Sequence, residues 1–252
     1  IFLMLTTFFS QKSFLNELLS ILQSKIVDRN KPPVIRQYAI GYLSSLLARA
    51  KFIPLKSLKS YLQQLCNFVH DYINSCNSVS YNMSPKAHAV FHATCQAIFY
   101  IIAFRHRDLD LVNAKSNVEF LIGLNIQPIV KHPLNPLFYC LPAIATIFDS
   151  VMAKHQIIYC QTILFKNASR KLATVYTTNE NHNPEDIIES VFPFDPYLLK
   201  KSGRKIEPIY IEYQGADDQE PTSSPTKVKK RERNESECCD DIIIPVKKSR
   251  MC

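Results

Sequence analysis

The sequence predicts an all-α protein made of HEAT-like helical repeats, an α-solenoid, followed by a disordered C-terminal tail. Apolar side chains recur every three or four residues through most of the chain before residue 173, which is the spacing of one buried stripe on a helix. Only 4 of the 252 residues are glycine, which argues against the tight turns of an all-β fold. Successive helices are joined by short loops, and each pair takes about 40 to 50 residues, the size of a HEAT repeat.

The first expected helix spans Ser13–Val27, and the loop DRNKPP separates it from a second helix over Val34–Ala50. Pro32 and Pro33 stand where a first helical turn tolerates proline, because the amides there have no intrahelical partner. A third helix is expected over Leu55–Cys76, where a similar apolar stripe continues. These three helices would begin the repeat array.

A fourth helix is expected from Ser84 to Phe104, with Ser84 as its N-cap and Pro85 at its first position. Because this helix is apolar over most of its circumference, we expect it at the centre of the fold. Shorter elements follow, namely helices near Val112–Leu124, Ala143–Lys154 and Gln156–Phe165 and a short apolar segment around Ile129. No stretch of the sequence shows strand alternation bounded by hairpin turns.

Composition divides the chain into three regions. Residues 1–172 form the expected repeat region, 173–215 a polar loop and an FPFDP anchor that closes the array, and 216–252 a disordered tail with basic clusters. Prolines restrict the backbone beside Phe192 and Phe194, so these rings and Asp195 are expected to anchor the segment on the helices, with a short helix after them over Pro196–Lys201. The tail cannot bury enough apolar surface to offset its ordering entropy.

Four blocks of the sequence carry a family resemblance. They are VIRQYAIGYLSSLLARAKFIPLKSL (Val34–Leu58), HAVFHATCQAIFYIIAFRHRDL (His88–Leu109), NPLFYCLPAIATIF (Asn135–Phe148) and VFPFDPYLLKKSGRKIEPIY (Val191–Tyr210). The segment FPFDPYLLK is the most specific of these, because no general structural requirement accounts for its sequence. Together the blocks resemble the TIF-IA family of RNA polymerase I-specific transcription initiation factors over roughly residues 30–212. The match would correspond to the C-terminal half of a longer factor.

The resemblance implies a noncatalytic adaptor in the nucleus and nucleolus. Members of the family bind RNA polymerase I near its stalk and bridge it to promoter-bound selectivity factor subunits at ribosomal RNA genes, and phosphorylation regulates that contact. The resemblance implies an α-solenoid and no cofactor. Weak nucleic-acid contact and a homodimer are further partner hypotheses. The mixed charge of the tail departs from the more acidic end expected of the family.

Positive charge is concentrated in the first helices. Nine Lys or Arg and two acidic residues lie between Lys12 and Lys59, a net charge of +7. The candidate partner-binding residues are Arg36, Arg49, Lys51, Arg105 and Arg107. The alternatives are a solvated helix face for the patch, and capping of the carbonyls of the preceding apolar helix by Arg105, His106 and Arg107. A basic surface also supports a second hypothesis, a HEAT-type nucleic-acid-binding or nuclear transport adaptor that uses the N-terminal helices.

The tail carries two basic clusters separated by a polar, acidic spacer, an arrangement typical of a bipartite nuclear import signal. The residues assigned to it are Lys229, Lys230, Arg231, Lys247, Lys248 and Arg250. Plain solubilising charge is the alternative reading. Ser224 precedes Pro225 and is a candidate for proline-directed phosphorylation, which would add about −1.5 to −2 charges there.

No motif in the sequence supports an enzyme, a metal site or a membrane span. His88, His92 and Cys95 share a helix face, but no fourth ligand is near in sequence, so a packed helix face is favoured over zinc. There is no glycine-rich phosphate loop and no nucleophile-elbow serine. The 8 cysteines include no C-x-x-C pair and indicate free thiols in a reducing compartment. The apolar runs are shorter than the roughly 20 residues of a spanning helix.

Overall fold

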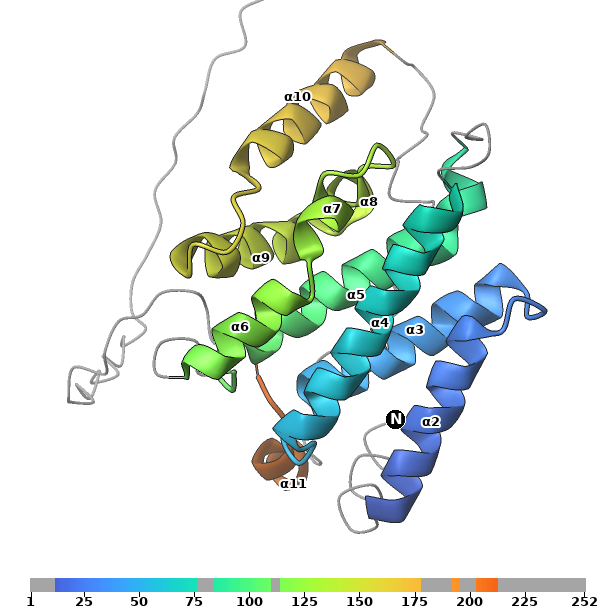
Figure 1. Cartoon of the computed structure of the whole chain (residues 1–252), viewed down its shortest axis with the longest axis vertical. Coiled ribbons are helices and arrows are strands. Elements are labelled where there is room, and N and C mark those ends of the chain that lie inside the picture. Colours follow the sequence, from blue (N-terminus) through green and yellow to red (C-terminus); the bar gives the residue numbers. More distant parts are fainter. Residues whose placement is uncertain (1–11, 77–83, 110–113, 178–191, 195–202, 213–252) are drawn as a thin grey trace, which may run out of the picture. The chain divides into compact units, whose positions relative to one another are not determined.

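A computed structural model describes residues 12–76, 84–109, 114–177, 192–194 and 203–212, and every regular element within them is a helix (Figure 1). The α-helices are α2 (Lys12–Val27), α3 (Pro33–Arg49), α4 (Leu55–Cys76), α5 (Ala89–Arg105), α6 (Lys115–Gly123), α7 (Ile126–Val130), α8 (Pro136–Tyr139), α9 (Pro142–Lys154), α10 (Gln161–Thr177) and α11 (Gly203–Ile206), and the 3-10 turns are η1 (Pro85–His88) and η3 (Glu207–Ile209). The all-α prediction is confirmed. The predicted tail, residues 216–252, lies outside the described residues.

The helices pack as successive pairs. α2 packs on α3 and α4 packs on α5, while α3, α5 and α9 contact one another in succession. In Figure 1 these pairs follow one another from α2 to α9, with α5 between α3 and α9. This is the arrangement of a helical repeat fold, in which each pair buries the apolar face of its neighbour.

α5 forms the centre of the hydrophobic core. All but one of its 17 residues are buried, and the rings of Phe99 and Phe148 lie 4.5 Å apart where α5 meets α9. Among the described residues, Pro85–Arg105 is the one helix that is long and apolar enough to cross a membrane, judged by length and composition alone. Of its most apolar 18-residue stretch, 89% is buried inside the fold. Burial against α3, α4, α8 and α9 accounts for this apolar composition.

Helix bounds agree closely with the stripes in the sequence for α2, α3, α4 and α9, and they differ at two places. The fourth helix opens with the 3-10 turn η1, and Ser84 makes no side-chain capping hydrogen bond. The prediction of a helix over Gln156–Phe165 is wrong, because α10 begins at Gln161 and continues to Thr177. The predicted region boundary at residue 172 therefore falls inside α10.

The physical reason for the displaced start of α10 is a tertiary hydrogen bond. Gln156 has a positive φ of 55°, a conformation that ends α9 instead of starting a helix. Asp149, on α9, then accepts a hydrogen bond from the Cys160 amide at 2.8 Å. Because the Asp149 carboxylate accepts a hydrogen bond from the amide of the residue directly before α10, the segment between the two helices is held as a turn.

The FPF segment docks on α3 and α5. Phe194 is 1% exposed, its amide donates to Ser45 Oγ at 3.0 Å, and its ring meets Tyr42 edge-on at 6.2 Å. Phe192 stacks on Tyr100 of α5 with ring centroids 4.3 Å apart. Asp195 lies outside the described residues.

The chain after η3 completes this docking. Lys51 donates its amide to the Ile209 carbonyl at 3.0 Å, and Ile211 donates to the Arg49 carbonyl at 2.8 Å, beside an antiparallel bridge between Ala50 and Tyr210. The described anchor contacts therefore lie on the end of α3 and on α5. The end of α3 offers unpaired backbone groups and Ser45 a hydroxyl acceptor for these contacts. Closure of the array by this segment stays a prediction.

We predict that Phe194→Ala lowers the free energy of unfolding by about 3 to 5 kcal/mol, because it empties a packed aromatic site. Tyr210→Phe removes the hydroxyl that donates to the Phe194 carbonyl at 2.6 Å and should cost about 1 kcal/mol. Urea unfolding of the full chain, followed by circular dichroism, measures both.

The matched control is Phe165→Ala, which truncates a phenylalanine that is 75% exposed on α10 and should change stability by less than about 0.5 kcal/mol. Equal effects of the two Phe→Ala substitutions would show that Phe194 is not packed in solution.

Candidate functional site

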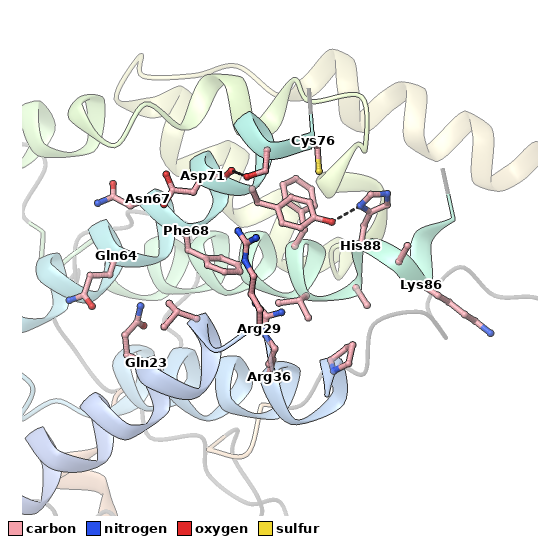
Figure 2. A pocket seen from close by; sticks show the side chains of 18 residues that line it. Gln23, Arg29, Arg36, Gln64, Asn67, Phe68, Asp71, Cys76, Lys86 and His88 are labelled. Carbon is pink, nitrogen blue, oxygen red and sulfur yellow. Dashed lines mark hydrogen bonds between the residues drawn. The ribbon is translucent and has the colours of Figure 1, made fainter. Parts of the chain in front are cut away.

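A groove of about 800 Å³ lies between the α2–α3 turn, α4 and η1, and it is partly open to solvent. Figure 2 shows it from close by. We call it the α4 groove, and it is lined by Gln23, Val27, Arg29, Pro33, Arg36, Gln64, Asn67, Phe68, Asp71, Tyr72, Ser75, Cys76, Lys86, Ala87, His88, Ala89, Val90 and Phe91. These residues come from two successive helix pairs, so the groove marks a junction between repeats.

Aromatic side chains form the base of the α4 groove. Tyr72 stacks on Phe91 with ring centroids 5.2 Å apart, and its hydroxyl is 2.7 Å from His88 Nδ1. Burial and, to a smaller extent, the neighbouring Cys76 raise the pKa of Tyr72 to about 12 against the opposing charge of Arg36, so the hydroxyl stays protonated. The ring of Phe68 lies one helical turn earlier on α4 and is partly exposed to the groove.

Two arginines stand together beside this aromatic base. Arg36 lies with its guanidinium carbon 5.6 Å from the centre of the Phe68 ring and donates Nε to the Ile26 carbonyl at 2.9 Å. Burial lowers the pKa of Arg36, the positive charge of Arg29 lowers it further, and Asp28 opposes both. Figure 2 shows Arg29 and Arg36 between α4 and the α2–α3 turn, with Lys86 at the far end beyond His88.

The groove has the composition of a binding surface. Three of its lining side chains are Arg or Lys and one, Asp71, is an acid. No group of three or more His, Cys, Asp or Glu that could hold a metal ion occurs in the described part of the chain. Burial raises the pKa of the Cys66 thiol to about 12, so this sulfur is a poor nucleophile.

Arg105 caps the C-terminal end of a neighbouring helix. Its Nη1 donates to the carbonyls of Leu47 and Ala50 at 3.0 Å each, Nη2 donates to the Ile53 carbonyl at 3.4 Å, and Nε pairs with Asp108 at 2.6 Å. Burial lowers the pKa of Arg105, and Asp108 offsets part of that effect. Arg105 therefore caps α3 and the turn after it, and not its own helix as the capping alternative supposed.

Arg49 lies in a cage of aromatic rings at the same place. Its Nε donates to the Tyr100 hydroxyl at 2.9 Å, and its guanidinium carbon is 4.1 Å from the centre of the Phe104 ring and 5.5 Å from that of Tyr210. Nη1 also donates to the Ile211 carbonyl at 3.3 Å. The guanidinium therefore joins α3, α5 and the C-terminal segment.

The burial of Arg49 and Arg105, 5% and 3% exposed, contradicts the expectation that they present charge to a partner. Inside the fold, the Arg105 guanidinium donates to carbonyls at the end of α3, and the Arg49 guanidinium packs against aromatic rings. Lys51 and Arg107 are exposed near them, and Arg36 lies in the α4 groove.

Ser224 and the import candidates Lys229, Lys230, Arg231, Lys247, Lys248 and Arg250 lie outside the described residues. Four residues of the α4 groove, Arg29, Phe68, Tyr72 and Lys86, were not predicted as site residues. In the sequence they are a loop arginine, two aromatic residues on a helix stripe and a lysine at the start of a helix, and none of these patterns indicates a site.

Three histidines gather where α5 begins. His92 packs 4.4 Å from the Tyr139 ring and 5.2 Å from Phe91, and its Nδ1 is buried without a hydrogen bond among the described residues. Burial lowers the pKa of His92 to about 3, with smaller contributions from His88 and His132. A neutral imidazole in an aromatic packing role matches the packed helix face that the sequence favoured over zinc.

Comparison with known proteins gives a consistent result. A family model described as RNA polymerase I specific transcription initiation factor RRN3 matches residues 1–218. The chain is 38% identical over 201 residues to RNA polymerase I-specific transcription initiation factor RRN3 of Mus musculus, covering 78% of this chain and 31% of the relative. It is 31% identical over 217 residues to the factor rrn3 of Schizosaccharomyces pombe, covering 82% of this chain and 35% of the relative.

A solved structure agrees at the level of fold. The crystal structure of RNA polymerase I transcription initiation factor Rrn3 superposes with a TM-score of 0.64 at 21% identity, over 84% of this chain and 48% of that chain. The present chain spans about a third of the length of the two curated relatives it matches.

We predict that Arg105→Met lowers the free energy of unfolding by about 3 to 5 kcal/mol, because it removes the guanidinium that donates to the Leu47, Ala50 and Ile53 carbonyls and pairs with Asp108. Lys51→Met, an exposed substitution two residues beyond α3, is the control and should change stability by less than about 0.5 kcal/mol. Denaturant midpoints that shift equally would contradict the capping role.

The lowered pKa of His92 predicts a stability that falls with acidification. Between about pH 6.5 and 3 the unfolded chain binds a proton that folded His92 does not, so stability is complete above pH 6.5 and decreases as the pH falls. His88, Tyr139 and Arg170 line the same small cavity as His92, and His132 is close enough to lower the His92 pKa further; none of these groups is an acid that would favour the imidazolium.

His92→Phe should therefore flatten the dependence of the urea midpoint on pH between pH 7 and 5. His155→Phe should flatten this pH dependence less. Burial also lowers the pKa of His155, but this histidine is more exposed than His92. An unchanged slope in His92→Phe would show that this imidazole is protonated in the folded chain.

Proposed function

The chain belongs to the family of RNA polymerase I-specific transcription initiation factors, and from that membership we propose that it supplies a polymerase-binding part of such a factor. The observation that carries the proposal is the family match over residues 1–218, a range that contains every residue the structure describes. The curated relatives from mouse and fission yeast are named as initiation factors for RNA polymerase I. A nuclear role follows from that assignment.

The proposed mechanism is noncatalytic. A scaffold whose central helix is buried on all sides, and whose C-terminal segment is bonded back onto α3, can present side chains in fixed positions. Binding then depends on complementarity of shape and charge, and little ordering entropy is lost because the contact surface is preorganised. No bond in a substrate is made or broken in this scheme.

The finer proposal concerns the partners. We propose contact with the stalk region of RNA polymerase I and a bridge from the polymerase to promoter selectivity factor subunits, in the nucleolus. Lys51 and Arg107 are the partner-binding candidates that remain exposed at the α3–α5 end. Weak nucleic-acid contact, which the positive charge of the first helices suggests, and homodimer formation belong to the same proposal.

One observation favours a second function, a HEAT-type nucleic-acid-binding or nuclear transport adaptor. Lys25, Arg29, Lys31, Lys51 and Lys56 are all exposed, so much of the positive charge of the first helices reaches solvent. Such charge binds phosphate backbones without sequence preference and with strong salt dependence. The burial of Arg49 removes one cation from that surface.

To test the proposed function, the tagged full chain is incubated with nuclease-treated nuclear extract, and the bound fraction is probed for the largest subunits of RNA polymerases I and II. We expect selective retention of polymerase I that persists at moderate salt. Equal recovery of the two polymerases, or recovery only before nuclease treatment, would favour the nucleic-acid-binding alternative.

The variant Lys51→Glu with Arg107→Glu should reduce polymerase I recovery about tenfold if the exposed cations form the contact, because charge reversal at an interface opposes association. Lys131→Glu with Lys166→Glu makes the same change of charge at exposed positions elsewhere and should leave recovery unchanged. A loss of the same size in both variants would point to net charge instead of a specific surface.

A further inference from the structure

We propose that the α4 groove binds a short acidic segment of a protein partner that carries an apolar anchor residue. The proposal goes beyond the assignment to a polymerase factor, because it names a site and an occupant that the family match does not supply. It depends on three features of the groove, namely an apolar base, an excess of positive charge and a composition unsuited to nucleic acid.

The apolar base calls for an apolar side chain. Phe68 and Tyr72 line the groove without being fully buried, and Val27 at its edge is 48% exposed. These three residues come from α2 and α4, so they face the same space from two sides. A groove between helices with an apolar base is the arrangement that accepts a side chain of a docked peptide segment, commonly from an amphipathic helix.

The charges around the base select an acidic segment. Arg29, Arg36 and Lys86 line the groove against the single acid Asp71. The positive charge of Arg29 is close enough to lower the pKa of Arg36, and Asp28 offsets this only in part. A carboxylate placed between the two guanidinium groups would relieve that repulsion and accept charge-assisted hydrogen bonds.

Arg36 is held in position for such a contact. Its Nε is fixed on the Ile26 carbonyl at the end of α2, and its guanidinium lies over the Phe68 ring. Within the described residues its terminal amino groups make no further hydrogen bond, so they remain available as donors. A preorganised arginine loses less entropy on binding than a freely rotating one.

Nucleic acid fits this groove poorly. A phosphate backbone gains affinity from many cations along a track, whereas the α4 groove offers three, with Asp71, Asn67 and Gln64 on its α4 side. A backbone of sugars and phosphates also brings no aliphatic group for the space between Val27 and Phe68. A volume of about 800 Å³ suits a few side chains of a peptide.

The test is a selection of peptides on the purified full chain. Random peptides of about 16 residues, displayed on phage, are selected for binding, and the enriched sequences are synthesised with a fluorescent label for anisotropy titration. We expect enriched peptides with net negative charge and a recurring aromatic or large aliphatic residue. No enrichment, or enrichment of neutral or basic peptides, would overturn the proposal.

Variants then place the binding site. Arg29→Glu with Lys86→Glu reverses two exposed cations of the groove and should weaken binding of the enriched peptides at least about tenfold, an effect of the size that charge reversal produces at interfaces. Lys25→Glu with Lys56→Glu changes the net charge equally at exposed positions outside the groove and should weaken binding less than about threefold. Circular dichroism confirms that both variants keep their helices.

Two further outcomes would contradict the proposal. The first is an equal loss of affinity in the two variants, since net charge and not the groove would then govern binding. The second is displacement of the bound peptide by a single-stranded oligonucleotide of about 20 nucleotides at physiological salt, which would assign the groove to nucleic acid. Failure of either kind leaves the retention of RNA polymerase I as a separate measurement, so the two proposals are judged independently.

Discussion

The C-terminal end of α3 is the place on which the rest of this structure depends. A helix ends with carbonyls that have no intrahelical partner, and here that end is buried, where each unpaired acceptor costs free energy. Donors from outside α3 pair with these carbonyls, namely the guanidinium of Arg105 from α5 and the amide of Ile211 from the C-terminal segment, and the Ile53 amide also donates to the Ala50 carbonyl. Helix α3, helix α5 and the last described residues are therefore held together by the hydrogen-bonding needs of one helix end.

The same constraint positions the α4 groove, which lies toward the other end of α3. Arg36 is in the first turn of α3, while Arg49 is its last residue. Fixing the distal end of a helix against α5 also fixes the direction in which its first turn points, because an α-helix behaves as a rigid rod over this length. The binding surface and the anchored core are thus two ends of one element.

Periodicity in the sequence was sufficient to predict the longer helices apart from α10, but it could not predict the arginine contacts. The bounds of α4 and α9 follow from apolar stripes that a single helix carries by itself. The burial of Arg49 and Arg105 depends on acceptors that lie more than 50 residues away, and arginine is seldom buried without such partners. Likewise the Asp149 side chain decides where α10 starts, and the α4 groove is assembled from residues of α2, α3, α4, η1 and α5. Neither feature shows in a local sequence pattern.

The return of the C-terminal segment to α3 has a consequence for how the chain is made. The hydrogen bond from Arg49 to the Ile211 carbonyl joins residues 162 positions apart, and that from Phe194 to Ser45 joins residues 149 apart. During synthesis α2 to α5 leave the ribosome before these partners are made. Arg49 and Ser45 therefore lack these two hydrogen bonds while the intervening repeats are translated. The early helices can pair through local contacts, but the packing around α3 is completed only when residue 211 emerges, which makes the final stage of folding a long-range closure.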